Sequence, residues 1–180
     1  MKNNKLFKPL QISIYAGFIF LSIAFTPQAK AISANFIPED SLNALRLVNN
    51  IRSQRNLDQL TWNDRLATAA QLKAIDMIQN NYFEHVSPSG ARAWSFIEKA
   101  DYSYMSAGEN LAIDYNSVQE ATKAWTLSQS HMANIVGDSY SEFGFAQITD
   151  SDGSKIYVQI FASPKPLYEI VLSDLANGKN

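Results

Sequence analysis

The stretch "SEFGFAQITDSDGSKIYVQIFA", residues 141–162, decides the fold class of this chain of 180 residues. Two runs rich in aromatic and β-branched residues surround "DSDG", in which Asp152 and Gly153 form a strong turn signal. Side chains alternate in both runs, so the stretch predicts two strands joined as a β-hairpin. The alternation places Phe143, Phe145 and Gln147 on one face of the first strand, and Ile156, Val158 and Ile160 on one face of the second.

The residues before the hairpin have helical spacing instead. Leu42, Leu45, Val48 and Ile51 recur as one face of a helix would, and "SVQE" at 117–120 is a capping box that predicts a helix start. The predicted helices lie within residues 38–56, 63–80, 93–100 and 118–128, with a further turn up to Gly137; between them, "HVSPSG" is predicted to be a loop and "YSYMSAGENLAI" a short strand that ends at Gly108. Helices followed by a hairpin predict an α+β fold.

The first 31 residues have the three-part pattern of a secretory signal peptide. Lysines precede an uncharged apolar run from Leu10 to Phe25, and "TPQAKA" ends the segment with small residues. This run of 16 residues is short for a spanning helix, which needs about 20, but an uncleaved anchor is the alternative. The predicted plan is a signal segment (1–31), a spacer (32–40), one domain (41–163) and a tail or edge strand (164–180).

Composition excludes several classes of partner and chemistry. Four of the 15 basic residues and none of the 17 acidic ones lie in residues 1–31, so the remainder has a formal net charge of −6. This charge argues against nucleic acid or anionic lipid as a main partner. The chain has no cysteine, which excludes disulfides and thiolate catalysis. The N-terminal pattern predicts a protein that is secreted or resides in the periplasm or cell envelope.

Polar residues that could form a site occur in three separate segments. They are Glu84 and His85 before a Pro-Gly loop, Glu109 and Asn110 after Gly108, and His131 and Asn134 followed by Glu142. Each also has a structural interpretation: His85 can bond a loop carbonyl, Glu109 can brace a loop, and His131 can be a cation at a helix C-terminus. Composition alone does not bring the three segments together.

Four motifs in register resemble the CAP superfamily, which comprises cysteine-rich secretory proteins, antigen 5 and plant pathogenesis-related proteins. The motifs are "VNNIRSQRNLDQLTWNDRLATAAQLKAIDM", "FEHVSPSG", "YSYMSAGENLA" and "AWTLSQSHMANIVGDSYSEFGFAQ". They lie within residues 41–162 and are most similar to the bacterial branch without cysteine. The resemblance implies a three-layer α-β-α sandwich with a small antiparallel sheet between helices.

The resemblance also implies a central cavity at the sheet edge, lined by His85 and Glu109. Many relatives add a second glutamate and a second histidine, and the four side chains can hold a divalent metal such as zinc. Here those two positions are Ser128 and Ile156. We therefore predict that His131 faces the cavity in place of the missing histidine.

Two further residues are predicted to join the cavity. They are Asn134 and Glu142, and for Glu142 a role in bracing a loop is the alternative.

Three functions stay open on these residues. The preferred hypothesis is non-catalytic binding of a lipid, small molecule or envelope protein, since the chain is rich in aromatic residues and has no nucleophile elbow. A hydrolase would use zinc held by His85 and His131, or Glu109 as a general base without metal. A structural role in the envelope is the third. No cofactor other than zinc is expected, and membrane contact only through an uncleaved N-terminal segment.

Overall fold

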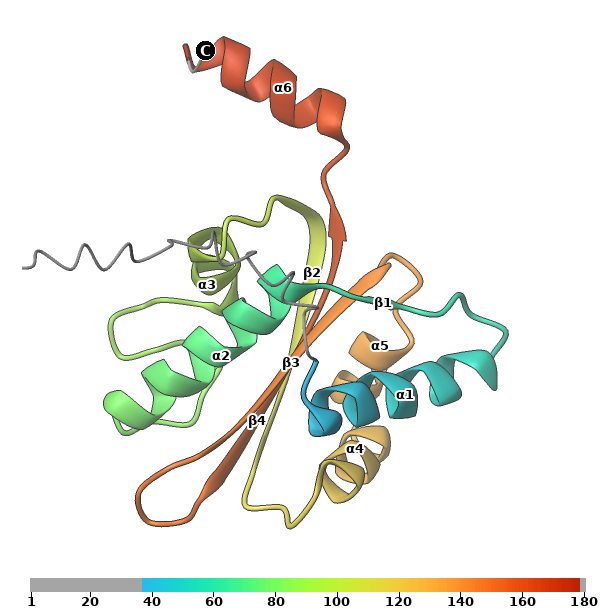
Figure 1. Cartoon of the computed structure of the whole chain (residues 1–180), viewed down its shortest axis with the longest axis vertical. Helices are drawn as coiled ribbons and strands as arrows, with labels where there is room; N and C mark the ends of the chain where they lie inside the picture. The colour runs from blue at the N-terminus through green and yellow to red at the C-terminus, as the bar shows by residue number, and fades with distance from the viewer. Residues whose placement is uncertain (1–36, 179–180) are drawn as a thin grey trace, which may run out of the picture. The chain divides into compact units, whose positions relative to one another are not determined.

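The computed structural model describes residues 37–178, and Figure 1 shows its elements in chain order. The predicted signal segment and most of the spacer lie outside the described residues. The elements are α1 (Glu39–Ser53), β1 (Thr61–Trp62), α2 (Asp64–Gln79), α3 (Ala93–Lys99), β2 (Tyr104–Ile113), α4 (Val118–Leu127), α5 (Gln129–Ile135), β3 (Glu142–Thr149), β4 (Lys155–Pro164) and α6 (Leu167–Ala176). The predicted α+β class is confirmed.

The predicted hairpin forms the centre of a four-stranded sheet with the strand order β1-β3-β4-β2. β3 and β4 pair antiparallel, with Phe143 opposite Phe161, and Asp150 closes the turn by accepting from Ser154 N at 2.9 Å. β2 pairs antiparallel with β4, whereas β1 is a short parallel neighbour of β3. The prediction that β2 ends at Gly108 is wrong, because Gly108 pairs with Phe161 and the ladder continues beyond it.

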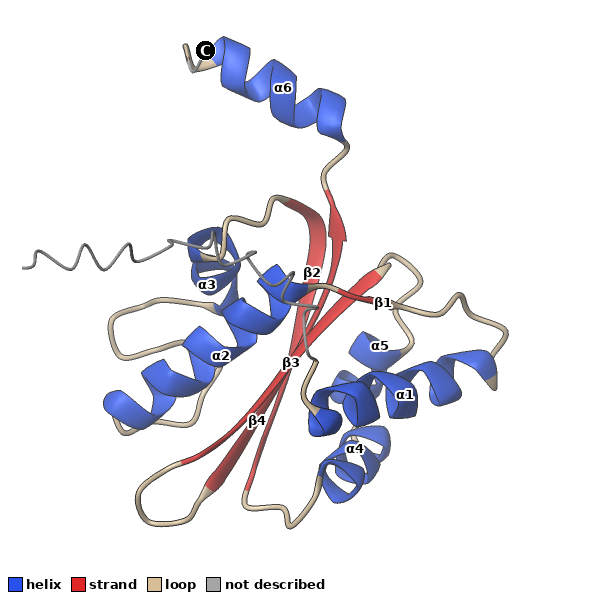
Figure 2. Ribbon diagram, in the orientation of Figure 1, coloured by secondary structure: helices blue, strands red, loops and turns tan. Residues whose placement is uncertain are grey.

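Both faces of the sheet are buried, and each has its own hydrophobic core. Phe143 and Phe145 face one core while Val158 and Ile160 face the other, since neighbouring residues of a strand point to opposite faces. Helices α1, α4 and α5 pack on the phenylalanine side, and α2 and α3 on the opposite side (Figure 2). The predicted three-layer α-β-α sandwich is therefore confirmed.

Helix α2 contacts β3 at very short range. A Cβ atom at Gly144 would lie 2.2 Å from the carbonyl carbon of Leu66 and 2.3 Å from Ala67 N. Ala69 and Ala70 on the same helix are fully buried, and their small side chains permit the approach. A residue larger than glycine at position 144 would push α2 away from the sheet.

Local sequence explains where several helices begin. The Asn63 side chain caps α2 by accepting hydrogen bonds from two N–H groups of the first turn, at 2.9 and 3.2 Å. Ser117 caps α4 in the same way, at 3.2 Å, as the capping box predicts. Helix α1 begins at Glu39, two residues before the predicted domain start at 41.

The C-terminal residues form a helix and not an edge strand. Of the predicted tail (164–180), the part from Leu167 to Ala176 is α6, so the edge-strand prediction is wrong for these residues. Pro166 precedes the first turn and Glu169 lies in it, and both residue types favour a helix start. None of the helices between residues 37 and 178 combines the length and the apolar character needed to cross a bilayer.

Candidate functional site

His85 lies in the loop between α2 and α3, as its sequence predicts. The loop is closed by Ser87, whose N–H donates to Ala91 O at 2.8 Å and whose Oγ accepts from Ala91 N at 2.9 Å. Gly90 has a φ of +84°, a conformation that glycine adopts without strain. These bonds fix the backbone that follows His85.

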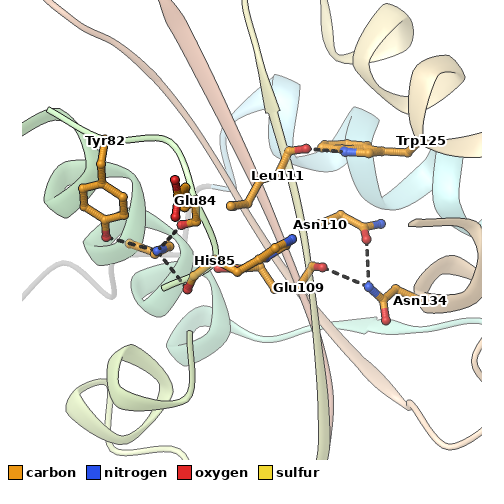
Figure 3. Close-up of polar contacts among 9 residues, drawn as sticks. Tyr82, Glu84, His85, Glu109, Asn110, Leu111, Trp125 and Asn134 are labelled. Atoms are coloured by element: carbon orange, nitrogen blue, oxygen red, sulfur yellow. Dashed lines mark hydrogen bonds and ion pairs between the residues drawn. The ribbon is translucent and has the colours of Figure 1, made fainter. Parts of the chain in front are cut away.

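The central feature of the site is a direct contact between His85 and Glu109 of β2 (Figure 3). His85 Nδ1 and Glu109 Oε1 lie 2.7 Å apart, and the Glu109 side chain is only 4% exposed against 59% for the imidazole. The hydrogen bond to the carboxylate raises the pKa of His85, against the opposing effect of partial burial. The second carboxylate oxygen, Oε2, is buried and has no hydrogen-bond partner within residues 37–178.

Asn134 of α5 fixes the backbone beside this carboxylate. Its Nδ2 donates to Glu109 O at 2.9 Å and to Asn110 Oδ1 at 2.8 Å (Figure 3). Gly108 permits this approach, because a Cβ atom there would lie 2.8 Å from Asn134 Oδ1 and 2.7 Å from Tyr140 Oη. The sequence "GEN" thus combines a residue for close approach, the buried carboxylate and an anchor to α5.

Lys73 of α2 donates hydrogen bonds to the backbone of the His85 loop. The residue is fully buried, and its Nζ donates to Tyr82 Oη at 3.1 Å, Glu84 O at 2.8 Å and His85 O at 3.3 Å. Burial lowers the pKa of Lys73, and the negative charge of Glu109 partly counteracts this effect. Lys73 therefore anchors the backbone of His85 and compensates the charge of Glu109.

His85 and Glu109 line a cavity of about 290 Å³ that has a polar side and an apolar side. His85, Glu109 and Asn134 form the polar side, and the Arg92 guanidinium at the surface makes no hydrogen bond or ion pair with any residue from 37 to 178. The lining residues are His85, Val86, Arg92, Ala93, Trp94, Ala107, Gly108, Glu109 and Asn134. A larger groove of about 380 Å³, beside α1 and β3, contains none of the predicted site residues.

His131 does not line this cavity, contrary to the prediction. It borders an adjoining groove of about 340 Å³, and its backbone O accepts from Asn110 Nδ2 at 3.1 Å. Burial and the charge of His85 lower the pKa of His131, so the two histidines interact electrostatically from separate sites. Helix geometry explains the difference. Asn134 of α5 lines the cavity, and His131, three residues earlier, lies about 4.5 Å away from that residue along the helix axis.

Glu142 also lies apart from the cavity. At the start of β3, its Oε2 accepts hydrogen bonds from Tyr102 Oη and, at 3.0 Å, from Asn63 Nδ2. Burial and the bond to Glu142 raise the pKa of Tyr102. The structure thus places Glu142 in its alternative role, bracing the segment before β2 against the start of α2.

The described side chains do not fit the predicted zinc site. Between residues 37 and 178, no three side chains of His, Cys, Asp or Glu lie close enough together to hold a metal ion. His85 and Glu109 are bonded to each other, and His131 borders a different groove. The set predicted from the sequence therefore lacks a third ligand.

Sequence reasoning missed Lys73, Arg92 and Trp94. Lys73 had a detectable signal, because it shares a helical face with the buried residues Leu66 and Met77. A lysine on an apolar face needs buried partners, and these usually have a specific role. Arg92 and Trp94 had no such signal, since their contact with the cavity depends on how the loop before α3 folds.

Comparisons with known proteins agree with the fold and the motifs. Residues 45–161 match the cysteine-rich secretory protein family, CAP. The uncharacterized protein YkwD of Bacillus subtilis (strain 168) is 30% identical over 117 residues, which cover 65% of this chain and 44% of that protein. The uncharacterized membrane protein YlbC of the same organism is 32% identical over 100 residues, covering 56% and 29%. The chain thus spans less than half the length of either relative.

Solved structures show the same architecture. An extracellular protein containing an SCP domain from Bacillus anthracis str. Ames superposes with a TM-score of 0.64 at 29% identity, over 69% of this chain and 40% of that chain. An outer surface protein from Borrelia burgdorferi has the same TM-score at 24% identity, over 69% and 92%, and shows a likeness of fold alone. Since the family match covers more than half of its residues, the chain belongs to the cysteine-rich secretory protein (CAP) family.

Proposed function

We propose that this CAP domain is an exported, non-catalytic binding module whose ligand enters the cavity beside His85 and Glu109. One observation carries the proposal: Glu109 Oε2 is buried and has no hydrogen-bond partner among residues 37–178, while Oε1 is bonded to His85. A buried acceptor without a donor costs about 1–3 kcal/mol. A ligand that donates an N–H or O–H to Oε2 would recover this free energy.

The other sides of the cavity define the ligand further. Val86, Ala93 and Trp94 offer an apolar wall, and Arg92 offers an uncommitted positive charge at the surface. A ligand with a hydrogen-bond donor, an apolar body and an acidic group would contact all three. The volume of about 290 Å³ suits a small molecule or one or two side chains of a protein partner.

The lining residues favour binding over hydrolysis. Among those described, none is a serine, threonine, cysteine, tyrosine or lysine, so no hydroxyl, thiol or amine nucleophile faces the cavity. A hydrolase would have to activate water with Glu109, whose Oε1 is already bonded to His85. Binding requires only the partnerless oxygen and the apolar wall.

Export is supported by the N-terminal pattern and by one relative. Residues 1–31 have a basic start, an apolar run and small residues at the end. The Bacillus anthracis relative, at 29% identity, is an extracellular protein. We expect protein recovered from its native source to begin near Ile32, whereas an intact Met1 would support an anchor.

The binding role can be tested by a fragment screen followed by NMR. The probes are small aromatic acids that also carry an amine or hydroxyl group. Bound fragments should shift the backbone amides of residues 107–110 and of the His85 loop. Glu109→Gln should weaken binding at least about tenfold, because it removes a charge-assisted hydrogen bond. The exposed Glu98→Gln is the matched control, and equal binding to both variants would contradict the proposal.

A further inference from the structure

The sheet has an open edge beyond β1. Strand β1 pairs only with Glu142 and Phe143, whereas β3 continues to Thr149 (Figure 2). Asn63 N donates to Phe143 O at 2.9 Å, and the chain then leaves the sheet because α2 begins at the next residue. From Gly144 onward, the described part of the chain therefore pairs with β3 only on its β4 side.

The open edge presents backbone groups that can pair with another strand. Because Phe143 O points toward β1, the alternation of a strand directs the N–H and C=O groups of Phe145 and Gln147 to the same side. No hydrogen bond joins these outward groups to any residue from 37 to 178. Such an edge is a template for an added strand.

The edge lies at the floor of a groove between the two helical layers. Helix α1 borders the groove on one side and α2 on the other, and the groove has a volume of about 380 Å³. It shares no lining residue with the His85 cavity. Its floor includes Phe145 and Gln147 of β3, and its walls include Asp40 of α1 and Gln71 of α2.

The charge of the groove selects the kind of partner. Asp40 at the start of α1 carries negative charge, and no lysine, arginine or histidine is among the described lining residues. We propose that this groove binds an extended, basic segment of a partner protein, which adds to β3 as a further strand. Backbone pairing at Phe145 and Gln147 supplies affinity, and a lysine or arginine side chain beside Asp40 supplies selectivity.

A designed peptide tests this site directly. The probe is an acetylated, amidated pentapeptide of alternating lysine and valine, long enough to span about 17 Å of strand. Its controls are the glutamate–valine counterpart and the basic peptide with N-methylated backbone nitrogens. We expect saturable binding of the unmodified basic peptide alone, with slower hydrogen exchange at the amides of Phe145 and Gln147.

Two substitutions separate backbone pairing from charge. Gln147→Pro removes an outward N–H and leaves the β3–β4 ladder intact, so binding should fall roughly fivefold. Asp40→Asn keeps the backbone and should weaken binding about two- to fivefold. Glu98→Gln, an exposed change on α3, is the matched control and should have no effect.

Other occupants give different results. If the β3 amides are already protected without peptide, residues of the same chain before Ile37 fill the groove and the proposal is wrong. If the protein dimerises and Gln147→Pro abolishes the dimer, a second copy of the chain is the occupant, and the proposal of a basic partner segment is wrong. Absence of saturable binding, or protection at amides away from β3, also refutes it. Because the groove and the His85 cavity share no residue, none of these results decides the proposed ligand cavity.

Discussion

Replacing Lys73 by methionine tests how the His85 loop is held. The substitution keeps a long apolar stem in the core and removes only the ammonium group. That group binds Tyr82 Oη and the backbone oxygens of Glu84 and His85. Since Lys73 is fully buried and methionine fills a similar space, water has little room to replace the lost donors.

The cost can be worked out from these contacts. A buried carbonyl left without its donor costs about 1–3 kcal/mol, so the two oxygens of Glu84 and His85, whose bonds to Lys73 are partly buried, together lose at most about 2–6 kcal/mol. Part of this returns, because the buried ammonium no longer has to be desolvated, which is the same effect that lowers the pKa of Lys73. We expect a net loss of about 3 kcal/mol in the free energy of unfolding, or roughly 6–12 °C in Tm.

Urea unfolding followed by tryptophan fluorescence measures this loss. The matched control is Lys123→Met on α4, where the lysine is exposed and a change within about 0.5 kcal/mol is expected. Faster hydrogen exchange in the His85 loop should accompany the loss in Lys73→Met. A loss no larger than that of Lys123→Met would refute the reasoning, because the loop would then be held by other contacts.

Three further outcomes concern pH, the core and metal. The bond to Glu109 raises the pKa of His85 above its value in the unfolded chain, about 6.5. The pair therefore stabilises the folded state fully below about pH 6.5, and this stabilisation is lost as the pH rises through the pKa of His85 in the folded state. The difference in Tm between the parent and His85→Ala should therefore shrink from about pH 6 to about pH 9, and a constant difference would contradict the pair. Gly144→Ala should destabilise the domain in urea by at least about 1–3 kcal/mol, and a smaller change would show that α2 lies farther from β3. Calorimetric titration should reveal no zinc site that depends on both histidines, and a one-to-one site lost in both His85→Ala and His131→Ala would restore the predicted centre.

The β-hairpin could be predicted because its signals are local. Asp152-Gly153 sets the turn, and the alternation around it determines which residues share a face. The helical layers on both faces followed instead from the resemblance, and the two cores, one containing Phe143 and the other Val158, agree with them. The end of β2 was misjudged, because a glycine in a strand weakens the pattern without breaking the ladder.

The candidate site was predictable only in part because it depends on distances between segments. The resemblance implied only that His85 and Glu109 line one cavity, and in the structure the two side chains lie 2.7 Å apart. The position of His131 depends on how α5 lies along β2, and a displacement of one helical turn moves a side chain to another groove. Glu142 depends in the same way on its partner Tyr102, which no sequence pattern connects to it.

The partners of Lys73 explain why Glu109 keeps a free oxygen. An ammonium group has three donors, and here Tyr82, Glu84 and His85 accept from all three. Lys73 can therefore compensate the charge of Glu109 only through space and cannot bond to it. Among the described residues, the carboxylate is thus stabilised in the interior while its Oε2 has no donor. A direct bond from Lys73 would satisfy both charges, but Lys73 bonds elsewhere, so Oε2 is the atom to which we propose that a ligand donates.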